Sequence, residues 1–350
     1  MADRTAIVAG AFGAVGHSLV AHLQSRGDWQ VIGFGRRPAP PGPYSRFIAV
    51  DLTDAEATRS ALSDLPSVDT VFFAAYAPRP TPAEEVGPNL AMLQNLMEAV
   101  EPRSPALGRV VLLQGSKWYG NHLGPYKTPA NEDDPRLPVP HFYYAQQDWL
   151  AERQAGKPWT WSALRPHAVI GFTQGSSMTL LNVLALYAAI SRELGQPLRF
   201  PGRPGAYTAA YQMTDAGLLA RAMVWAATTP ACANRPFNIT NGDLVRWCHV
   251  WPKIAAAFDM EAGPPQKLSL EAAMADKEPL WADMVARHGL QPNTLAQLAS
   301  WRFGDFVFAS DYDHISNLTQ ARQAGWCESL DTETALIQQL RALRQERVVP

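Results

Sequence analysis

The sequence predicts an α/β protein built on a Rossmann-like, doubly wound parallel sheet, with a smaller and mainly helical C-terminal region. Three observations predict this fold. A glycine-rich turn follows the first apolar segment, short apolar segments alternate with helical patterns through the first half, and helical patterns dominate after about residue 171. Strands that alternate with helices form βαβ units, and such units give a parallel sheet covered on both faces.

Six apolar segments have the length and composition of buried strands: residues 5–9, 30–35, 47–50, 70–75, 109–114 and 160–165. Helical spacing of apolar residues indicates helices over 15–26, 54–62, 89–100 and 144–153. Beyond them, further helices are expected at 179–194, 215–226, 268–275, 280–285 and 332–346, with a strand at 236–239. We therefore expect a sheet domain over residues 1–172 and a helical substrate or lid region over 173–350. Whether parts of the second region return to the sheet is left open.

The composition of the 350 residues suits a globular protein, since 47% are hydrophobic and 18% charged. A net charge of −2 gives no indication of a nucleic-acid or anionic-membrane partner. No apolar segment approaches the roughly 20 residues of a membrane span, and the N-terminus leads directly into a strand without a signal-peptide pattern. We therefore expect a cytoplasmic protein.

Cysteine and histidine patterns give no indication of a metal site. The three cysteines include no CxxC pair, which favours isolated reduced thiols, and the eight histidines lack HxxxH or HExxH spacing. We expect no bound metal.

The glycine-rich turn GAFGAVG places Gly10, Gly13 and Gly16 between the first predicted strand and the first helix. Glycines allow a sharp turn and a close approach of the backbone to a pyrophosphate, while the helix N-terminus presents free N–H groups. This context predicts a dinucleotide site, and the same turn adds further predicted contacts from Phe12, Ala14 and Val15.

The second strand ends in Gly35, Arg36 and Arg37, where an NAD site usually has an acidic residue. Arginines offer charge-assisted hydrogen bonds to a 2′-phosphate, so we expect NADPH or NADP+ as the cofactor. The alternative is that both arginines are solvated surface residues.

Other predicted cofactor contacts follow the third, fourth and fifth strands. Asp51 either contacts the adenine or caps the next helix, a role that Asp54 could also fill. Small residues at the end of the fourth strand leave room for the adenosine. The predicted contacts from these strand ends are Asp51, Leu52, Ala74, Ala75, Tyr76, Gln114 and Gly115.

The usual catalytic pair of a short-chain dehydrogenase is a tyrosine with a lysine four residues later. No such pair follows the fifth strand, because Gln147 and Asp148 occupy the positions where the lysine would stand. Lys117 instead follows the fifth strand directly, at the edge of the sheet where substrates bind in this architecture. We therefore expect Lys117 to supply from a loop the charge that a helix usually supplies.

The chain resembles the progesterone 5β-reductase/iridoid synthase-like family of the short-chain dehydrogenase/reductase superfamily. Matching segments run nearly from end to end and include FGRRP, QGSKWYG, EDDPRLPVPHFYY, TWSALRPHAVIGF, FNITNGDLVRW and EPLWADMVARHGLQP. The similarity is greatest to bacterial and fungal members. It implies an extended or atypical dehydrogenase that uses NADPH to reduce the carbon–carbon double bond of enones or enals, with steroid- or terpenoid-like compounds as candidates.

The resemblance implies Tyr143 and Lys117 as the catalytic residues, which stabilise the enolate-like oxygen, with Tyr144 as an alternative to Tyr143. A nearby ammonium is expected to lower the pKa of the phenol. The remaining implied cofactor contacts are Tyr143, Pro166, Ile170, Ser176, Ser177 and Met178, and the implied substrate contacts are Trp118, Tyr119, Tyr144 and Ala168.

The sequence departs from the family pattern at several positions. Trp118 stands where the plant members often have His, His141 replaces Asn before FYY, and His167 and Ala168 replace Gly-Asn or Gly-Thr. These changes leave the substrate open more than the type of reaction.

Two other functions remain as alternatives, a carbonyl reductase or epimerase of the same fold and a non-catalytic NADP sensor. The expected partner is a small hydrophobic substrate, without nucleic acid or membrane, and a homodimer is left open.

Overall fold

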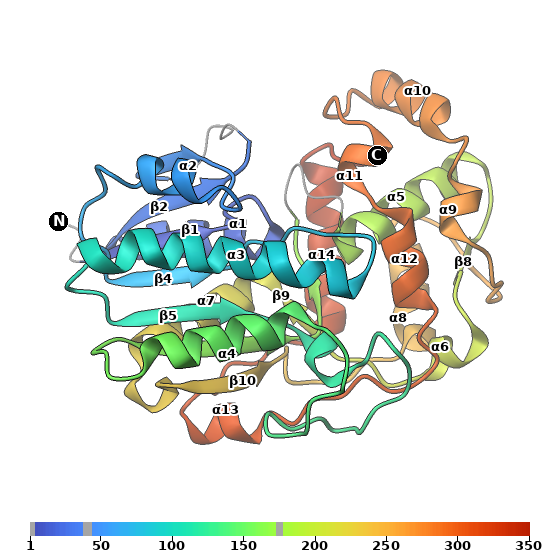
Figure 1. Ribbon diagram of the computed structural model, residues 1–350. Coiled ribbons are helices and arrows are strands. Elements are labelled where there is room, and N and C mark those ends of the chain that lie inside the picture. The colour runs from blue at the N-terminus through green and yellow to red at the C-terminus, as the bar shows by residue number, and fades with distance from the viewer. Residues whose placement is uncertain (1–3, 38–43, 173–177) are drawn as a thin grey trace.

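The computed structural model describes residues 4–37, 44–172 and 178–350. At its centre is a parallel seven-stranded sheet with the strand order β10-β6-β5-β4-β1-β2-β3 (Figure 1). Every neighbouring pair in this sheet is parallel, as predicted. The strands are β1 (Arg4–Ala9), β2 (Trp29–Gly35), β3 (Arg46–Ala49), β4 (Thr70–Phe73), β5 (Arg109–Leu113), β6 (Thr160–Pro166) and β10 (Arg235–Ile239).

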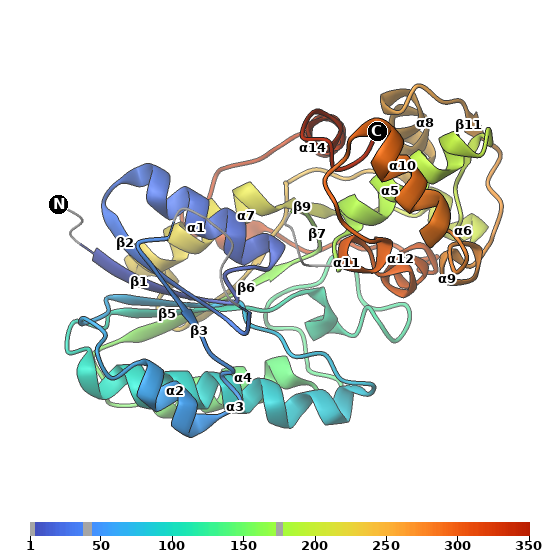
Figure 2. The same cartoon turned by 90° about the horizontal axis from the view of Figure 1, so that it is seen from above.

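Helices cover both faces of the sheet (Figure 2). One face carries α1 (Ala14–Arg26) and α7 (Ala216–Thr228), and the other carries α2 (Ala55–Ala61), α3 (Pro82–Val100) and α4 (Phe142–Gln154). Alternate side chains of β1 enter two separate apolar cores, with Ala6 and Val8 on the α1 side and Ile7 and Ala9 on the α3 side. Burial on both faces explains why these strands are continuous apolar segments.

Part of the second half of the chain belongs to the sheet and its covering layer. Strand β10 lies beside β6, with Phe237 opposite Leu164, and α7 packs against α1. Residues 216–239 are therefore part of the sheet domain, although they follow residue 172 in the sequence. This is the return to the sheet that the sequence left open.

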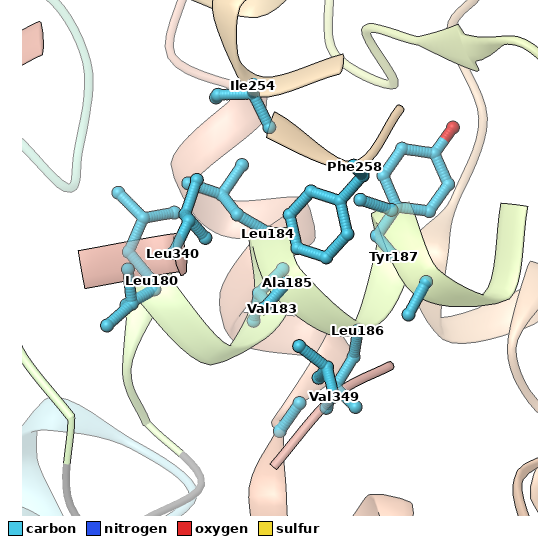
Figure 3. Close-up of a cluster of buried hydrophobic side chains, with 14 of the residues drawn as sticks. Leu180, Val183, Leu184, Ala185, Leu186, Tyr187, Ile254, Phe258, Leu340 and Val349 are labelled. Carbon is cyan, nitrogen blue, oxygen red and sulfur yellow. The ribbon is translucent and has the colours of Figure 1, made fainter. Parts of the chain in front are cut away.

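Residues 319–323 also pack against β10, and the other C-terminal elements form a mainly helical lobe beside the carboxyl ends of the strands (Figure 1). Its central helix, α5, is buried over residues 180–191. Figure 3 shows Leu184 of this helix close to Ile254 and Leu340. The helices after α4 are α5 (Leu180–Glu193), α6 (Pro204–Thr208), α8 (Trp247–Ala257), α9 (Leu270–Ala273), α10 (Glu278–His288), α11 (Leu295–Leu298), α12 (Trp301–Phe308), α13 (Thr319–Gln323) and α14 (Thr332–Gln345).

Two small parallel sheets complete the fold, β7 (Ala168–Ile170) with β9 (Met213–Asp215) and β8 (Leu198–Arg199) with β11 (Ala262–Gly263). Within the described ranges, no helix has both the length and the apolar character of a membrane span.

Several predicted boundaries were wrong. Helix α4 begins at Phe142 rather than 144, because the His141 side chain accepts a hydrogen bond from the Tyr143 backbone N–H and caps the helix earlier. Helices α6, α11, α12 and α13 were not predicted, and neither was α8. It contains Pro252, a residue that usually interrupts helices, but tertiary packing buries its apolar side.

Candidate active site

The glycine turn has the geometry that a dinucleotide site requires. Gly10 has φ +83°, and a Cβ there would lie 2.6 Å from the Ala74 carbonyl oxygen. A Cβ at Gly16 would lie 2.2 Å from the Gly10 carbonyl oxygen, whereas one at Gly13 would meet only ordinary contact at 3.5 Å. The first and third glycines therefore close the turn, and the second leaves its outer side open.

Helix α1 begins at Ala14 with Gly13 as its N-cap, followed by Val15, and no side chain caps this end. Its first turn has no acidic residue. The first N–H groups of a helix lack partners within the helix, and the helix dipole gives this end a partial positive charge. The N-terminus of α1 is therefore suited to a phosphate group.

A cleft of about 760 Å³ opens beside this turn. Arg36 and Arg37 follow β2 and are exposed at its wall. Phe12 stacks on Phe47 with ring centres 4.6 Å apart and closes the cleft near Gly35. The lining consists of Gly10, Phe12, Gly13, Phe34, Gly35, Arg36, Arg37, Val50, Leu52, Ala74, Ala75, Tyr76, Pro78, Met92 and Met178.

Asp51 does not cap a helix. Asp54 is the N-cap of α2, and the Asp51 carboxylate instead accepts two hydrogen bonds from Thr53. These bonds hold the pKa of Asp51 below its usual value, and the charges of Arg36 and Arg79 act in the same direction. The sequence interpretation missed Arg79, which the structure brings near the predicted adenine end of the cleft.

The segment after β4 is fixed by a buried asparagine of α3. Asn89 accepts a hydrogen bond from the Ala77 backbone N–H and donates one to the Ala77 carbonyl oxygen, both 2.9 Å long. The same side chain donates to the Glu85 carbonyl oxygen. This clamp holds Ala75 and Tyr76, the predicted cofactor contacts, at the wall of the cleft.

Tyr143 lies in the first turn of α4, next to the end of β5. Gly115 makes room for its hydroxyl, since a Cβ at this residue would lie 3.2 Å from the Tyr143 oxygen and 3.6 Å from the Pro166 carbonyl oxygen. The predicted residues Gly115, Tyr143 and Pro166 therefore lie together. Gln114 is buried, and its side chain donates to the Tyr143 carbonyl oxygen at 3.3 Å.

Gln147, four residues after Tyr143, has a structural role. Its side-chain oxygen accepts hydrogen bonds from Gln114 at 3.3 Å and from the Arg165 guanidinium at 3.2 Å. At the position where ordinary dehydrogenases have a lysine, this chain thus has a glutamine whose hydrogen bonds link α4 to the ends of β5 and β6.

Lys117 lies on the short 3-10 helix η2 (Ser116–Tyr119), directly after β5. Its ammonium nitrogen lies 5.6 Å from the centre of the Phe306 ring, which α12 contributes from the helical lobe. The pKa of Lys117 is lowered, because the effect of burial is larger than the opposing effect of the Glu85 carboxylate. The lysine therefore faces the space between the sheet and the lobe.

The expected lowering of the Tyr143 pKa by a lysine was wrong. Burial raises the pKa of this phenol, and the Glu85 carboxylate raises it further. Tyr143 is therefore a protonated hydrogen-bond donor at neutral pH.

Trp118, Tyr119 and Tyr144 belong to a buried aromatic cluster. Tyr119 donates to Asn238 and Tyr144 donates to the Trp118 carbonyl oxygen, both at 2.6 Å. The buried Arg165 guanidinium lies 3.6 Å from the centre of the Trp118 ring. These contacts favour a structural role for the cluster, which fixes the loop that carries Lys117.

The last predicted residues lie around β7. Ile170 is fully buried, Ala168 is half-buried, and Met178 is 45% exposed at the cleft beside the glycine turn. Ser176 and Ser177 lie outside the described residues.

Two histidines near Lys117 are neutral at physiological pH. Burial lowers the pKa of His122 to about 4 and that of His141 to about 3, and the Lys117 charge contributes to both. Within the described ranges, no group of three or more His, Cys, Asp or Glu side chains is arranged to hold a metal ion.

Solved structures with a similar fold cover nearly the whole chain. A UDP-N-acetylglucosamine 4-epimerase from Methanobrevibacter ruminantium has a TM-score of 0.70 at 16% identity, over 99% of both chains. A short-chain dehydrogenase/reductase superfamily protein from Agrobacterium tumefaciens, solved with bound NAD, has a TM-score of 0.67 at 17% identity, over 99% of this chain and 98% of that one.

Closer relatives come from plants. An (S)-8-oxocitronellyl enol synthase of Camptotheca acuminata is 33% identical over 99% of this chain and 93% of its own length. A 3-oxo-Δ4,5-steroid 5β-reductase of Arabidopsis thaliana is 33% identical over 99% and 94%. The model of the PRISE-like Rossmann-fold domain matches residues 50–350. The chain therefore belongs to the PRISE-like Rossmann-fold family, which confirms the resemblance found in the sequence.

Proposed function

We propose that this protein uses NADPH to reduce the carbon–carbon double bond of α,β-unsaturated carbonyl compounds. The proposal rests on the placement of two residues at the end of β5. The Tyr143 hydroxyl lies against Gly115, which follows β5, and Lys117 lies on the 3-10 helix η2 directly after it. The names of two relatives, a steroid 5β-reductase and an oxocitronellyl enol synthase, support this type of reaction.

The cleft fits a dinucleotide with a 2′-phosphate. Gly10 and Gly16 close the turn and Gly13 leaves its outer side open to a pyrophosphate. The uncapped N-terminus of α1 offers N–H groups, and Arg36 and Arg37 supply positive charge. When bound, NADPH would supply the hydride that adds to the β-carbon of the substrate.

Tyr143 and Lys117 would act on the carbonyl oxygen of the substrate. Addition at the β-carbon moves negative charge onto that oxygen, so groups that donate hydrogen bonds or carry positive charge there stabilise the transition state. Tyr143 keeps its proton because its pKa is raised, and the Lys117 ammonium adds positive charge.

The substrate would enter between the sheet and the helical lobe. Phe306 is 39% exposed and lies beside Lys117, so it offers an apolar surface next to a polar head group. A hydrophobic enone or enal has this combination of a polar carbonyl and an apolar body.

The direct test measures NADPH oxidation with a panel of enones, enals and ketones, followed by identification of the products. A saturated carbonyl product supports the proposal, whereas an allylic alcohol would indicate a carbonyl reductase instead.

Tyr143→Phe should lower turnover about 100-fold or more, since it removes the hydrogen-bond donor, and should leave NADPH affinity nearly unchanged. Tyr144→Phe is the matched control, because its hydroxyl is already bonded to the Trp118 carbonyl oxygen. Full activity of Tyr143→Phe together with an inactive Tyr144→Phe would transfer the role to Tyr144.

Replacing Arg36 and Arg37 together with alanine should weaken NADPH binding at least tenfold and leave NADH binding nearly unchanged, because a charge-assisted hydrogen bond contributes about 1.5–3 kcal/mol. Arg59→Ala, which removes an exposed arginine of α2, serves as the control. Equal losses for both cofactors, measured by fluorescence titration, would contradict the 2′-phosphate assignment.

We further propose a cytoplasmic location. All three cysteines are free thiols, and thiols persist in reducing compartments. Cell fractionation would test this placement.

A further inference from the structure

We propose that His141 is a further catalytic residue of this active site: its Nε2–H donates a hydrogen bond to the carbonyl oxygen of the substrate, beside the Tyr143 hydroxyl. This role deepens the proposed function and rests on the placement of Tyr143 in it. Three features of the ring support the proposal, namely a fixed tautomer, a fixed position next to Tyr143 and an open outer nitrogen.

The N-terminus of α4 fixes the tautomer of the His141 ring. His141 is the N-cap of this helix, and its Nδ1 accepts a 3.1 Å hydrogen bond from the Tyr143 backbone N–H. A ring nitrogen that accepts a hydrogen bond carries no proton, so the proton of the neutral ring lies on Nε2. The positive end of the helix dipole disfavours a second proton, and burial lowers the pKa of His141 to about 3. The ring is therefore a neutral donor.

Contacts with neighbouring aromatic rings hold His141 next to both segments that carry the catalytic residues. The centre of its ring lies 4.6 Å from that of Tyr143 and 5.1 Å from that of Phe142, on which it stacks with planes at 20°. The ring of His122 lies 5.6 Å away in an edge-on arrangement. His122 belongs to the loop that follows Lys117 and the 3-10 helix η2. The imidazole is therefore fixed where α4 meets this loop.

The outer nitrogen of the ring is open. His141 is only 6% exposed, and its Nε2 has no hydrogen-bond partner within the described ranges. Nε2 is nevertheless not one of the fully buried polar atoms that lack a partner, whereas Nδ1 of the neighbouring His122 is. The donor thus reaches accessible space beside Tyr143. Because the polar groups of a protein interior are nearly always hydrogen-bonded, this N–H is suited to an oxygen atom of a bound ligand.

A neutral imidazole N–H suits the oxygen on which charge develops in the proposed reaction. Hydride addition at the β-carbon places negative charge on the carbonyl oxygen, and a donor already fixed there stabilises that charge. The ring gives up no proton in this role. Neutral imidazoles held at helix N-termini polarise carbonyl groups in other enzymes. Asparagine, which the family pattern has at this position, likewise combines a cap acceptor with an N–H donor.

Substitutions at residue 141 separate capping from donation. A serine hydroxyl can cap the helix but is too short to replace Nε2–H, whereas alanine does neither. We expect His141→Ser and His141→Ala to lower kcat for enone reduction at least tenfold, with little change in NADPH affinity. The melting temperature of His141→Ser should lie above that of His141→Ala. His141→Asn, which keeps a cap and an N–H, should retain more activity than either.

The matched control is His249→Ser, which replaces an exposed histidine of α8 and should keep the kcat of the wild type. If His141 acted only as a helix cap, serine would restore kcat together with the melting temperature. A His141→Ser variant with the kcat of the wild type would therefore overturn the proposal.

A second measurement is independent of turnover. 4-Nitrophenolate presents a negatively charged oxygen on a flat conjugated ring, as the enolate-like state of the substrate does, and its absorbance reports the charge. The protein is titrated with 4-nitrophenol in the presence of NADP+. Binding to His141→Ser should be at least tenfold weaker than binding to the wild type or to His249→Ser, because the variant lacks a hydrogen bond to the charged oxygen. Equal affinities would contradict the assignment of Nε2–H.

The two proposals fail in different ways. If the wild-type protein reduces no enone but 4-nitrophenol binds more weakly to His141→Ser, the proposed reaction is wrong and the donor role of His141 stands. If enones are reduced but neither kcat nor 4-nitrophenol affinity changes in His141→Ser, the reaction stands and the role of His141 is wrong. Circular dichroism identifies a variant that does not fold, and His141→Thr, which offers the same hydroxyl cap, then replaces His141→Ser.

Discussion

Lowering the pH from 7 to 5 should strongly destabilise this protein because three histidines are buried in their neutral form. His141, His167 and His314 are only 6%, 4% and 3% exposed. Burial lowers their pKa from 6.5 to about 3, about 3 and about 4, respectively. Each ring has a neighbour suited to the neutral form, such as the Ser316 hydroxyl 2.8 Å from His167 Nε2.

The direction follows from proton binding. The unfolded chain takes up a proton at each histidine as the pH falls through 6.5, whereas the folded protein does not until about pH 4 or below. Stability is therefore complete above pH 6.5 and decreases below it. At pH 5 each of these three histidines costs about 2 kcal/mol, and the three together about 6 kcal/mol. His122, whose pKa is lowered to about 4, adds a smaller cost because it is only partly buried. That sum is comparable with the whole folding free energy of a typical domain, about 5–15 kcal/mol.

Guanidinium unfolding followed by circular dichroism at pH 7, 6, 5.5 and 5 measures this dependence. Between pH 5 and 6 the free energy of unfolding should change by about 4–5 kcal/mol per pH unit, and His167→Gln should remove about a quarter to a third of that slope. His249→Gln replaces an exposed histidine of α8 and is the matched control. A wild-type slope near zero in this range would refute the reasoning, as would a His167→Gln slope equal to that of the wild type.

Two further predictions concern the glycines of the site. Gly16→Ala should abolish cofactor binding and lower thermal stability, because its Cβ would lie 2.2 Å from the Gly10 carbonyl oxygen. Gly13→Ala is the control and should fold normally. Equal melting temperatures for the two variants would contradict this prediction. Gly115→Ala should lower kcat about tenfold without changing NADPH affinity, since its Cβ would meet the Tyr143 hydroxyl at 3.2 Å and displace it slightly; unchanged kcat in steady-state assays would argue against the placement of Tyr143.

The fold, and the grouping of the glycines and arginines around one cleft, could be predicted because both depend on local patterns. Gly10, Gly13 and Gly16 lie within seven residues, and Arg36 and Arg37 follow a strand whose apolar pattern is clear. Such features require only that each segment forms its own element. Gly115 was predicted from the end of the fifth strand and Tyr143 through the family resemblance, and the structure brings the two residues together.

Other features could not be predicted because they depend on contacts between distant segments. The charge of Glu85 reaches Lys117 and Tyr143 only after α3, η2 and α4 assemble at the same edge of the sheet. Trp118 was expected at the substrate, but the guanidinium of Arg165, 47 residues later in the chain, stacks on its ring. A sequence alone does not distinguish an aromatic residue that faces a pocket from one that packs against a buried arginine.

The return of α7 and β10 to the sheet bears on how the chain folds during synthesis. Until residue 239 has left the ribosome, β6 has no neighbour on its outer side, and the face that α7 covers stays partly open to water. An unpaired strand edge beside uncovered apolar residues attracts other chains. A nascent chain that ends near residue 172 should therefore bind chaperones, and the sheet domain should become stable only after residues 216–239, which follow the first two helices of the lobe, have been made.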